Sequence, residues 1–331
     1  MSVLKSASYY LLISKLNLSM KNTFHKTLFL FILLVANSSL GQQKDVYLFS
    51  YFTNNGQDGL HFAYSKDGLS WETVKDGKSY LKPEIGKDKL MRDPCLIQAN
   101  DGTFHMVWTS GWYDKIIGYA SSKDLINWSE QKAIPVMEHE PTAKNSWAPE
   151  VFYDDKKKEY LIFWATTIPG RHGDVAESEK EKGLNHRIYY TKTKDFKTFS
   201  KTEMFFNPDF SAIDATILKD GKSYFMFVKN ENPNPPQKNI RVIESKKASS
   251  FSTNVSAPIT GNYWAEGPTS IRIGEYVYVY FDKYRDHKYG AIRSKDLKTW
   301  EDISDKVSFP KGLRHGTVLK VSEAVFEGLG K

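Results

Sequence analysis

Cysteine is almost absent from this sequence, because Cys95 is the single one among 331 residues. No intramolecular disulfide can form, so the fold must be held together by packing alone. Long apolar runs are also missing, since the run at 28–35 is far below the roughly 20 residues that a membrane-spanning helix needs. Helical periodicity is nearly absent as well, which disfavours a helical fold. The net charge is +7, but basic and acidic residues are interspersed, so the sequence does not indicate a nucleic-acid partner.

The N-terminal segment has the features of a secretion signal. Positive residues precede the short apolar run at 28–35, and small residues follow at 39–41. No cysteine follows this run, so we do not expect a lipid anchor. We predict that residues 1–41 are a leader and signal peptide, with the true start either at Met1 or at Met20. The mature protein is then exported to the periplasm or the extracellular space.

A seven-residue phrase recurs five times after this leader. Each copy opens with a hydroxyl residue and a lysine and closes with an aromatic residue. The copies are SKDGLSW at 65–71, SKDLINW at 122–128, TKDFKTF at 193–199, SKKASSF at 245–251 and SKDLKTW at 294–300. The closing aromatics lie 57, 71, 52 and 49 residues apart, a spacing that suits units of four short strands. We expect each phrase to form a hairpin turn, in which Asp tolerates the turn geometry, and its aromatic to open the next strand.

A second series of motifs marks strand starts in phase with the phrases. Its ionisable residues, which we call the heads, lie 22, 22, 15, 15 and 15 residues after the preceding closing aromatic. This regularity predicts an all-β fold, a five-bladed β-propeller with one head at the start of each innermost strand. The last head has no phrase after it, so a C-terminal strand at 317–321 must join N-terminal strands near 46–52 in one blade. That closure hides exposed sheet edges and makes residues 42–331 one domain.

The five heads all carry ionisable side chains. They are Asp93, Glu150, Asp214, Glu266 and His315. Innermost strands line the channel of a propeller, so we expect these side chains to occupy equivalent places and to converge on the axis. Crowded carboxylates disfavour one another's ionised forms, and at least one pKa among them should be raised. One protonated acid beside one ionised base is what glycosidic cleavage requires. The alternative is that these residues cap strand starts or bind water in the channel.

The ordered motifs RDP, WAPE, AIDA, AEGP and RHG resemble those of glycoside hydrolase family 43, and the resemblance covers residues 45–325. It implies a five-bladed propeller that cleaves glycosidic bonds with inversion. By position it implies that Asp93 is the general base, that Glu266 is the general acid and that Asp214 orients and tunes this acid. The chain departs from the family pattern at AIDA, where AIDP is commoner, and at Cys95 after DP, which we predict to be a core residue.

The resemblance also suggests roles for the two remaining heads. Glu150 stands where the family often has the Asp of WAPD, a position that supports the site or touches sugar, so we predict substrate contact. His315 matches a histidine that helps many members to hold a hydrated calcium ion in the channel. The implied chemistry requires no cofactor, and any calcium would be structural.

Aromatic and basic residues near the heads are candidates for sugar binding. Trp147 and Trp264 lie shortly before two of the heads, and Trp112 follows a predicted strand. Each tryptophan either packs against a sugar face or belongs to the core. Arg92 and Arg314 either bind sugar hydroxyls or pair with the carboxylates, and we favour pairing, while retaining Arg314 as a substrate-binding candidate.

A polar insertion, residues 169–187, explains the long spacing of 71 between two of the closing aromatics. Loops of this length on a propeller face are often functional. It forms either one wall of the pocket, where Arg171, His172 and His186 would meet substrate, or a solvated surface loop.

The predicted activity has alternatives. A retaining propeller hydrolase of the sucrose type would need Asp in an Asn-Asp-Pro context and Glu before Cys, and neither context occurs. A non-catalytic carbohydrate-binding propeller should have lost catalytic residues, and a protein scaffold leaves the acidic face unexplained. Within the family we favour exo-acting hydrolysis of α-L-arabinofuranosides or β-D-galactofuranosides in plant or microbial polysaccharide. A β-xylosidase and an endo-arabinanase are the alternatives, and the sequence does not indicate an oligomeric state.

Overall fold

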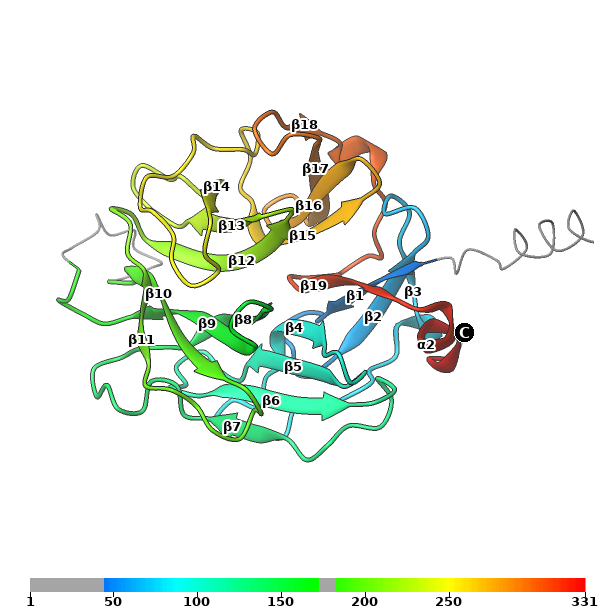
Figure 1. Ribbon diagram of the computed structural model, residues 1–331, viewed down its shortest axis with the longest axis horizontal. Helices are drawn as coiled ribbons and strands as arrows, with labels where there is room; N and C mark the ends of the chain where they lie inside the picture. Colours follow the sequence, from blue (N-terminus) through cyan, green and yellow to red (C-terminus); the bar gives the residue numbers. More distant parts are fainter. Residues whose placement is uncertain (1–44, 173–182, 331) are drawn as a thin grey trace, which may run out of the picture. The chain divides into compact units, whose positions relative to one another are not determined.

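The computed structural model describes residues 45–172 and 183–330, and the regular secondary structure of these residues is almost entirely β-strand (Figure 1). Residues 45–331 form one compact unit, and the predicted leader at 1–41 lies outside the described residues. Five antiparallel sheets surround a common axis, so the predicted five-bladed propeller is confirmed. In the described part of the chain, no helix has the length and apolar character needed to cross a membrane.

Each blade has one strand at the axis, and its other strands follow outward. Blade 1 contains, from the axis outward, β19 (Thr317–Val321), β1 (Val46–Tyr51), β2 (His61–Ser65) and β3 (Glu72–Thr73). In the same order, blade 2 contains β4 (Arg92–Gln98), β5 (Phe104–Thr109), β6 (Ile117–Ser122) and β7 (Lys132–Ile134). Blade 3 contains β8 (Trp147–Asp154), β9 (Glu159–Thr167), β10 (His186–Thr193) and β11 (Glu203–Phe206). Blade 4 contains β12 (Ala212–Asp220), β13 (Ser223–Asn230) and β14 (Asn239–Ser245). Blade 5 contains β15 (Glu266–Ile273), β16 (Tyr276–Lys283), β17 (Lys288–Ser294) and β18 (Glu301–Asp302). The remaining elements are η1 (Lys75–Gly77), η2 (Ser304–Lys306) and α2 (Glu323–Gly328).

Blade 1 closes the ring as the order of the motifs predicts. The C-terminal strand β19 pairs antiparallel with the N-terminal strand β1, with Thr317 opposite Ser50 and Val321 opposite Val46. The edge of β1 that faces the axis is therefore covered by the other end of the chain. This pairing ties two segments together that are far apart in the sequence.

The recurrent phrases form turns whose hydrogen bonds explain their composition. In the second copy, Oγ of Ser122 accepts from the backbone N–H groups of Asp124 and Leu125. Oδ1 of Asp124 then accepts from the N–H groups of Ile126 and Asn127. The first, third and fifth copies repeat this pattern. In these four copies the left-handed backbone falls on the fourth residue rather than on the Asp, at Gly68, Leu125, Phe196 and Leu297.

The fourth copy departs from this pattern, and blade 4 has three strands in place of the four predicted. Lys247 stands where the other copies have Asp, so the side-chain acceptor for the last two N–H groups is missing. No fourth strand follows Phe251. In the other copies the next strand begins one to four residues after the closing aromatic, so the prediction that the aromatic itself opens the strand is wrong. The outer edge of β14 is covered instead by an irregular segment, in which the N–H groups of Ser256 and Ile259 donate to the carbonyls of Val242 and Ile240.

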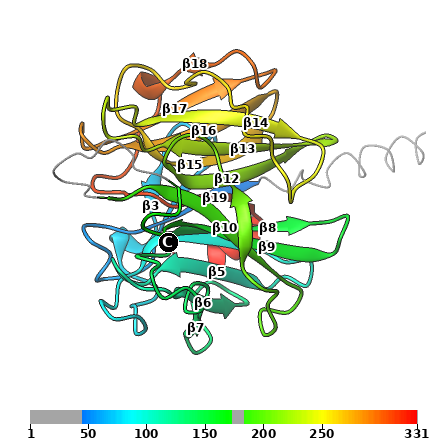
Figure 2. The ribbon, with the colours of Figure 1, turned by 90° about the vertical axis from the view of Figure 1, so that its left-hand side faces the viewer.

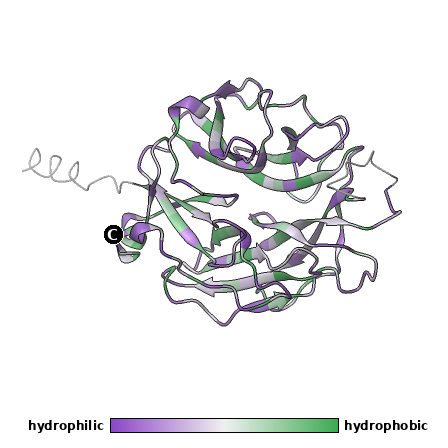
Figure 3. Ribbon diagram, turned by 180° about the vertical axis from the view of Figure 1, so that it is seen from behind, coloured by the Kyte–Doolittle hydropathy of each residue, from purple (hydrophilic) through white to green (hydrophobic). Residues whose placement is uncertain are grey.

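The core consists of five hydrophobic clusters, and each cluster is built from two neighbouring blades. Phe49 from blade 1, for example, packs edge-on against Tyr280 and Tyr289 from blade 5. Figure 3 shows hydrophobic and hydrophilic residues mixed along the strands, as expected when side chains alternate between two faces. Figures 1 and 2 place blades 2 and 5 on opposite sides of the axis. The ring is therefore held by the clusters between neighbouring blades.

Candidate active site

Four innermost strands share one irregularity at the point where they enter the channel. The register with the neighbouring strand shifts after Arg92, Trp147, Ile213 and Glu266. The next residue in each strand has left-handed backbone, with φ of 53° at Asp93, 46° at Ala148, 53° at Asp214 and 58° at Gly267. Such bulges bend a strand and re-aim its side chains. Repeating the bulge in four blades brings these side chains together around the axis.

The bulges show that the five heads are not equivalent, contrary to the prediction. Asp93 and Asp214 both occupy the left-handed position. Glu266 lies one residue before that position in its strand, and Glu150 lies two residues after it. Spacing from the aromatic phrases could not detect offsets this small, because the connecting loops vary in length. Glu150 therefore aligns with Cys95 and Thr216 rather than with Asp93.

A pocket of about 250 Å³ opens at the entry ends of the innermost strands, and we call it the axial pocket. Seven of the nine predicted site residues line it: Asp93, Trp112, Trp147, Asp214, Glu266, Arg314 and His315. The sequence patterns assigned no site role to five further lining residues, Thr109, Ala148, Ile213, Lys229 and Glu231, and predicted that Arg92 pairs with carboxylates. Glu150 and Trp264 do not line it. The structure thus brings the three predicted catalytic carboxylates to one pocket.

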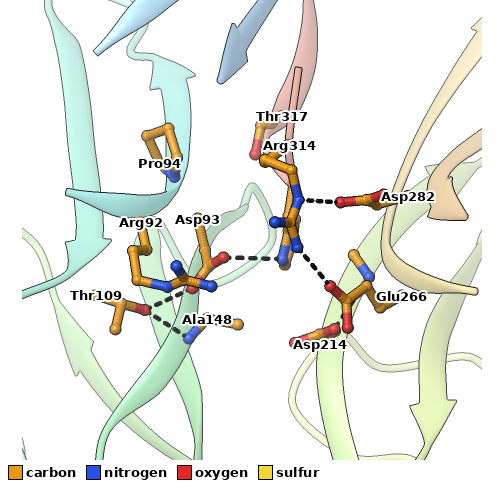
Figure 4. A network of polar contacts seen from close by, with 12 residues as sticks. Arg92, Asp93, Pro94, Thr109, Ala148, Asp214, Glu266, Asp282, Arg314 and Thr317 are labelled. Carbon is orange, nitrogen blue, oxygen red and sulfur yellow. Dashed lines mark hydrogen bonds and ion pairs between the residues drawn. The ribbon is translucent and has the colours of Figure 1, made fainter. Parts of the chain in front are cut away.

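Asp93 lies on one side of the axial pocket and is held as a carboxylate. Thr109 Oγ1 donates to Oδ2 of Asp93 at 2.8 Å, and Nδ1 of His315 lies 3.3 Å from Oδ1 (Figure 4). Burial alone would raise the pKa of Asp93, but the hydrogen bond and positive charge of His315 outweigh it and lower the pKa to about 2. Burial lowers the pKa of His315, but Asp93 and the nearby Asp214 and Glu150 raise it to about 9. The pair is therefore ionised at neutral pH.

Glu266 lies across the pocket from Asp93, and Figure 4 shows its contact with Arg314. Lys229 is a second cation in contact with Glu266. Its Oε2 is 3.0 Å from Nζ of Lys229, and its Oε1 is 3.2 Å from a terminal nitrogen of Arg314. Arg314 also pairs through Nε with Asp282 at 2.5 Å, and Asp282 stands directly opposite Glu266 in the β15–β16 ladder. Arg314 thus separates two carboxylates that would otherwise repel each other. The preference for carboxylate pairing is confirmed for Arg314.

Asp214 connects β12 to the backbone beside Glu266. Its Oδ2 accepts from the N–H of Gly267 at 3.0 Å, and the left-handed backbone of Gly267 would place any Cβ 2.4 Å from the His315 ring. Burial raises the pKa of Asp214 to about 6, against the opposing charges of His315 and Lys229 and with the support of Glu266 and Asp93. A raised carboxyl pKa among the heads is thus found as predicted, but its largest cause is burial, and the predicted effect of neighbouring carboxylates is a smaller contribution.

Glu150 lies deeper in the channel, where it is buried and outside the axial pocket. Its two carboxyl oxygens accept from Thr216 at 3.1 Å and from Thr317 at 3.3 Å. Burial raises the pKa of Glu150 to about 7, although the charge of His315 opposes the shift. The place of Glu150 suits support of the channel rather than contact with a sugar, and its predicted substrate contact stays a prediction.

Cys95 is buried beside Glu150 and belongs to a hydrophobic cluster, as its prediction as a core residue requires. Its Sγ accepts from the N–H of Val151 at 3.3 Å. Burial and the neighbouring charge of Glu150 raise the pKa of the thiol well above its ordinary value. The thiol therefore stays protonated at neutral pH.

Two tryptophans and one arginine form the rim on the side of Asp93. Nε1 of Trp147 donates to the carbonyl of Trp112, and the two indole rings meet edge to face with centroids 5.7 Å apart. The guanidinium of Arg92 lies 4.4 Å from the Trp112 ring centroid and 4.7 Å from that of Phe52, and it donates to Asn55. Among the described residues Arg92 makes no direct ion pair, so its predicted pairing with a carboxylate holds only at longer range, where its positive charge helps to lower the pKa of Asp93. Its guanidinium is also held by the faces of the Phe52 and Trp112 rings.

Trp264 lies away from this rim. Its ring contacts Tyr284, Lys238 and Arg285, with the guanidinium of Arg285 4.2 Å from the ring centroid. Its sugar-binding role stays a prediction that the axial pocket does not support.

The described parts of the insertion do not reach the axial pocket. Arg171 pairs with Glu140, and His172 contacts the hydroxyl of Tyr189. His186 is buried against Trp147. Residues 173–182 lie outside the described part, so the prediction of a pocket wall stays a prediction.

The predicted calcium ion near His315 also stays a prediction. Across 45–172 and 183–330, no group of three or more His, Cys, Asp and Glu side chains is arranged to hold a metal ion. His315 directs Nδ1 to Asp93 and is protonated at neutral pH, and an imidazolium cannot ligate a cation. The residues present do not fit a metal bound directly by His315.

Lys229 and Asp282 were not predicted from the sequence. Lys229 ends an apolar stretch of β13, MFV, where a lysine directed inward breaks the pattern, and this was the available signal. Asp282 similarly follows the apolar run of β16. Both residues reach the axis from the second strand of their blades, whereas the motif series marks only the first strand of each blade.

A five-bladed propeller with three carboxylates of contrasting environment around one axial pocket defines a glycoside hydrolase by class. The sequence matches, over residues 43–327, the family described as probable glycosyl hydrolase domain, a group related to glycoside hydrolase family 43. The chain belongs to this family.

Individual relatives agree with the family assignment. An α-L-arabinofuranosidase of Bifidobacterium longum is 25% identical over 160 residues, which are 43% of this chain and 15% of that protein. The match thus spans a small part of the relative's length. The α-L-arabinofuranosidase of Lactobacillus brevis has the same fold, with a TM-score of 0.50 and 17% identity over 65% of this chain and 72% of that one. A thermostable family-43 glycoside hydrolase has the same fold with a TM-score of 0.52. It is 17% identical, and the match covers 68% of this chain and 78% of that one.

Proposed function

We propose that this protein hydrolyses glycosidic bonds with inversion, using Asp93 as general base and Glu266 as general acid. The observation that carries the proposal is that Asp93 is held ionised on one side of the axial pocket while Glu266 faces it from the other (Figure 4). An inverting enzyme needs a carboxylate to activate water and an acid to protonate the leaving oxygen, with roughly 6.5–9.5 Å between the two carboxyl groups to admit the water. Both residues line a pocket of about 250 Å³, a size that suits a terminal sugar.

The proton transfers follow from these contacts. Asp93 takes a proton from the attacking water while His315 stabilises its orientation through Oδ1. Glu266 gives its proton to the glycosidic oxygen of the leaving group, on the opposite face of the sugar. Asp214 holds the backbone of Gly267, the residue next to Glu266, and so sets the direction of the acid. No step requires a metal ion.

For the substrate, we propose exo-acting cleavage of α-L-arabinofuranosides or β-D-galactofuranosides. The α-L-arabinofuranosidase from Bifidobacterium supports the first of these sugars, within the 160 residues that match. A compact pocket with Trp112 and Trp147 at its rim supports exo action, because an endo-enzyme needs an open groove for the polymer. A β-xylosidase, an endo-arabinanase and a non-catalytic sugar-binding propeller are the alternatives. We propose export on the basis of the leader at 1–41.

The test is hydrolysis of 4-nitrophenyl α-L-arabinofuranoside, β-D-galactofuranoside and β-D-xyloside by residues 42–331 and by three variants. Asp93→Asn should lose at least about 100-fold in kcat/KM, the usual contribution of a general base. Glu266→Gln should lose less on these activated leaving groups and much more on natural oligosaccharides. Glu244→Gln, which removes an exposed carboxylate from β14, should keep full activity. Release of the β-anomer from an α-glycoside would show inversion. Full activity of Asp93→Asn would contradict the site, and silence of the folded wild type on these glycosides and on arabinan would contradict the function.

A further inference from the structure

Lys229 is a charged residue that the reaction described above does not use. It lies in β13 opposite Ile213, at the last paired position before the β12 bulge. Its side chain is 3% exposed, and yet it reaches the axial pocket. Burial would lower the pKa of Lys229, but Glu231 and Glu266 raise it well above its ordinary value, so the lysine is a buried cation.

The lysine lies in the middle of a chain of alternating charges. Nζ of Lys229 is 2.5 Å from Glu231 and 3.0 Å from Glu266, and Glu231 also pairs with Lys238 at 2.7 Å. On the far side, Glu266 pairs with Arg314, which pairs with Asp282 as described above. This series of ion pairs therefore links blades 4 and 5 to the loop that precedes β19.

Stability alone does not explain such a chain. Burying charged pairs costs desolvation free energy, and apolar side chains of similar size often stabilise a fold as well or better. Lys229 contacts the carboxylate on which the proposed reaction depends, and its charge also lowers the pKa of Asp214 against the effect of burial. The position of this cation, beside the acid and beside its orienting partner, indicates a role in the reaction.

The two cations on Glu266 differ in freedom. The side chain of Arg314 is 32% exposed at the pocket, whereas that of Lys229 is 3% exposed and is further held by the face of Tyr284, 4.8 Å from Nζ. A sugar that enters the pocket can displace Arg314 from Oε1 without disturbing Lys229 on Oε2. Oε1 would then face the glycosidic oxygen while Oε2 stays anchored.

We propose that Lys229 is a positioning residue for proton donation: it anchors Oε2 of Glu266 and stabilises the carboxylate that forms when the proton leaves. This inference rests on the proposed function. In the step itself, the O–H bond of Glu266 breaks and its proton passes to the leaving oxygen, whose bond to the sugar breaks. The negative charge stays on Glu266, in contact with Lys229. Lys229 does not touch the reacting atoms.

The experiment compares aryl glycosides of one sugar whose leaving phenols range from dinitrophenol to unsubstituted phenol. Lys229→Met should slow the phenyl glycoside at least tenfold more than the dinitrophenyl glycoside, because only poor leaving groups need the proton. The alkaline limb of its kcat/KM profile should move to higher pH, since a cation beside the acid is lost. The charged and titratable groups around that acid are Lys229, Arg314, Asp214, Asp282, His315, Tyr289 and Glu231, the second partner of Lys229. All but Lys229 are kept in the variant, and Glu231 keeps its pairing with Lys238.

Three further variants keep the test decisive. Lys229→Arg should restore most of the rate on the phenyl glycoside, and Lys229→Gln serves if the methionine variant does not fold. Lys238→Met removes an equally buried lysine that pairs with Glu231, so it should lower the melting temperature and leave the dependence on the leaving group unchanged. Equal slowing of every glycoside by the Lys229 and Lys238 variants would show a structural role only and overturn the inference. A wild type that cleaves none of the glycosides would overturn the proposed function and this inference with it.

Discussion

Nδ1 of His315 lies 3.3 Å from Oδ1 of Asp93, which connects the segment before β19 to the start of β4. The contact joins the last blade motif of the chain to the first, and it fixes the charge of the proposed base. Because both partners are buried, each keeps the other ionised over a wide pH range. The consequences can be measured separately from catalysis.

His315→Gln should make stability less dependent on pH in the alkaline range. The folded pKa of His315 is about 9 against 6.5 in the unfolded chain, so its stabilisation is complete below pH 6.5 and disappears as pH rises through 9. For Asp93 the folded pKa is about 2 against 3.8, so its stabilisation is lost as pH falls from 3.8 to 2. The melting temperatures of the wild type and of His315→Gln should differ strongly at pH 6 and be equal above pH 9. A difference that stays constant across this range would contradict the ion pair.

Glu150→Gln should stabilise the protein at alkaline pH. Burial raises the pKa of Glu150 from 4.5 to about 7, so the folded state holds this proton more tightly and loses stability as pH rises between these values. The glutamine amide keeps the shape of the glutamate side chain and carries no charge. Above pH 7 the free energy of unfolding of the variant should therefore exceed that of the wild type by roughly 3 kcal/mol at most. Below pH 4.5 the variant should show no gain. Denaturant unfolding at pH 4 and pH 8 checks this, and a gain at pH 4 alone would contradict the assigned cause.

The thiol of Cys95 should not react in the folded protein. It is 2% exposed, and burial with the charge of Glu150 raises its pKa well above the ordinary value, so the reactive thiolate is absent at neutral pH. Ellman's reagent should detect no thiol in the native protein and one equivalent in guanidinium chloride. Fast native labelling would mean that the channel below the axial pocket is open to solvent.

Asp124→Ala should lower stability without altering activity. Oδ1 of Asp124 accepts from two backbone N–H groups that the turn leaves without another acceptor, and the turn lies on the outer part of blade 2. Losing these contacts should reduce the melting temperature by roughly 2–4 °C. Lys123→Ala, in the same turn, removes an exposed ion pair with Asp101 and should change the melting temperature much less. Equal effects of the two changes would argue against the turn geometry as the reason for the repeated Asp.

Arg92→Met should weaken substrate binding more than turnover. Arg92 lines the axial pocket, makes no ion pair among the described residues and holds Trp112 by stacking, so it is available to sugar hydroxyls. We expect KM to rise about tenfold, the effect of losing one or two hydrogen bonds from a charged donor. Arg92→Lys keeps the charge but not the planar fork, and it should recover only part of the loss. An unchanged KM in both variants would assign Arg92 to rim structure alone.

The local patterns of the sequence were sufficient for the architecture. Alternating strands, five turn phrases, four of them with an Asp acceptor, and one head per blade predicted the propeller and its closure through β19 and β1. These features act over a few residues, which is why they can be recognised without contacts. The missing fourth strand of blade 4 was also signalled, since Lys247 replaces the Asp that the other turns use, but its meaning was clear only from the β14 edge.

The site required the tertiary structure. Bulges of the same kind in β4, β8, β12 and β15 set the depth of four of the five heads, and they depend on strand pairing, which spacing along the chain does not reveal. They separate Glu150 from the axial pocket although it fits the same motif series. Lys229 and Asp282 reach Glu266 from second strands, at positions that only folding around a common axis makes neighbours. The local sequence determined which residue types stand at the start of each innermost strand. Only the packing of the blades decided which charged side chains contact one another, because these ion pairs form between blades rather than between neighbours along the chain.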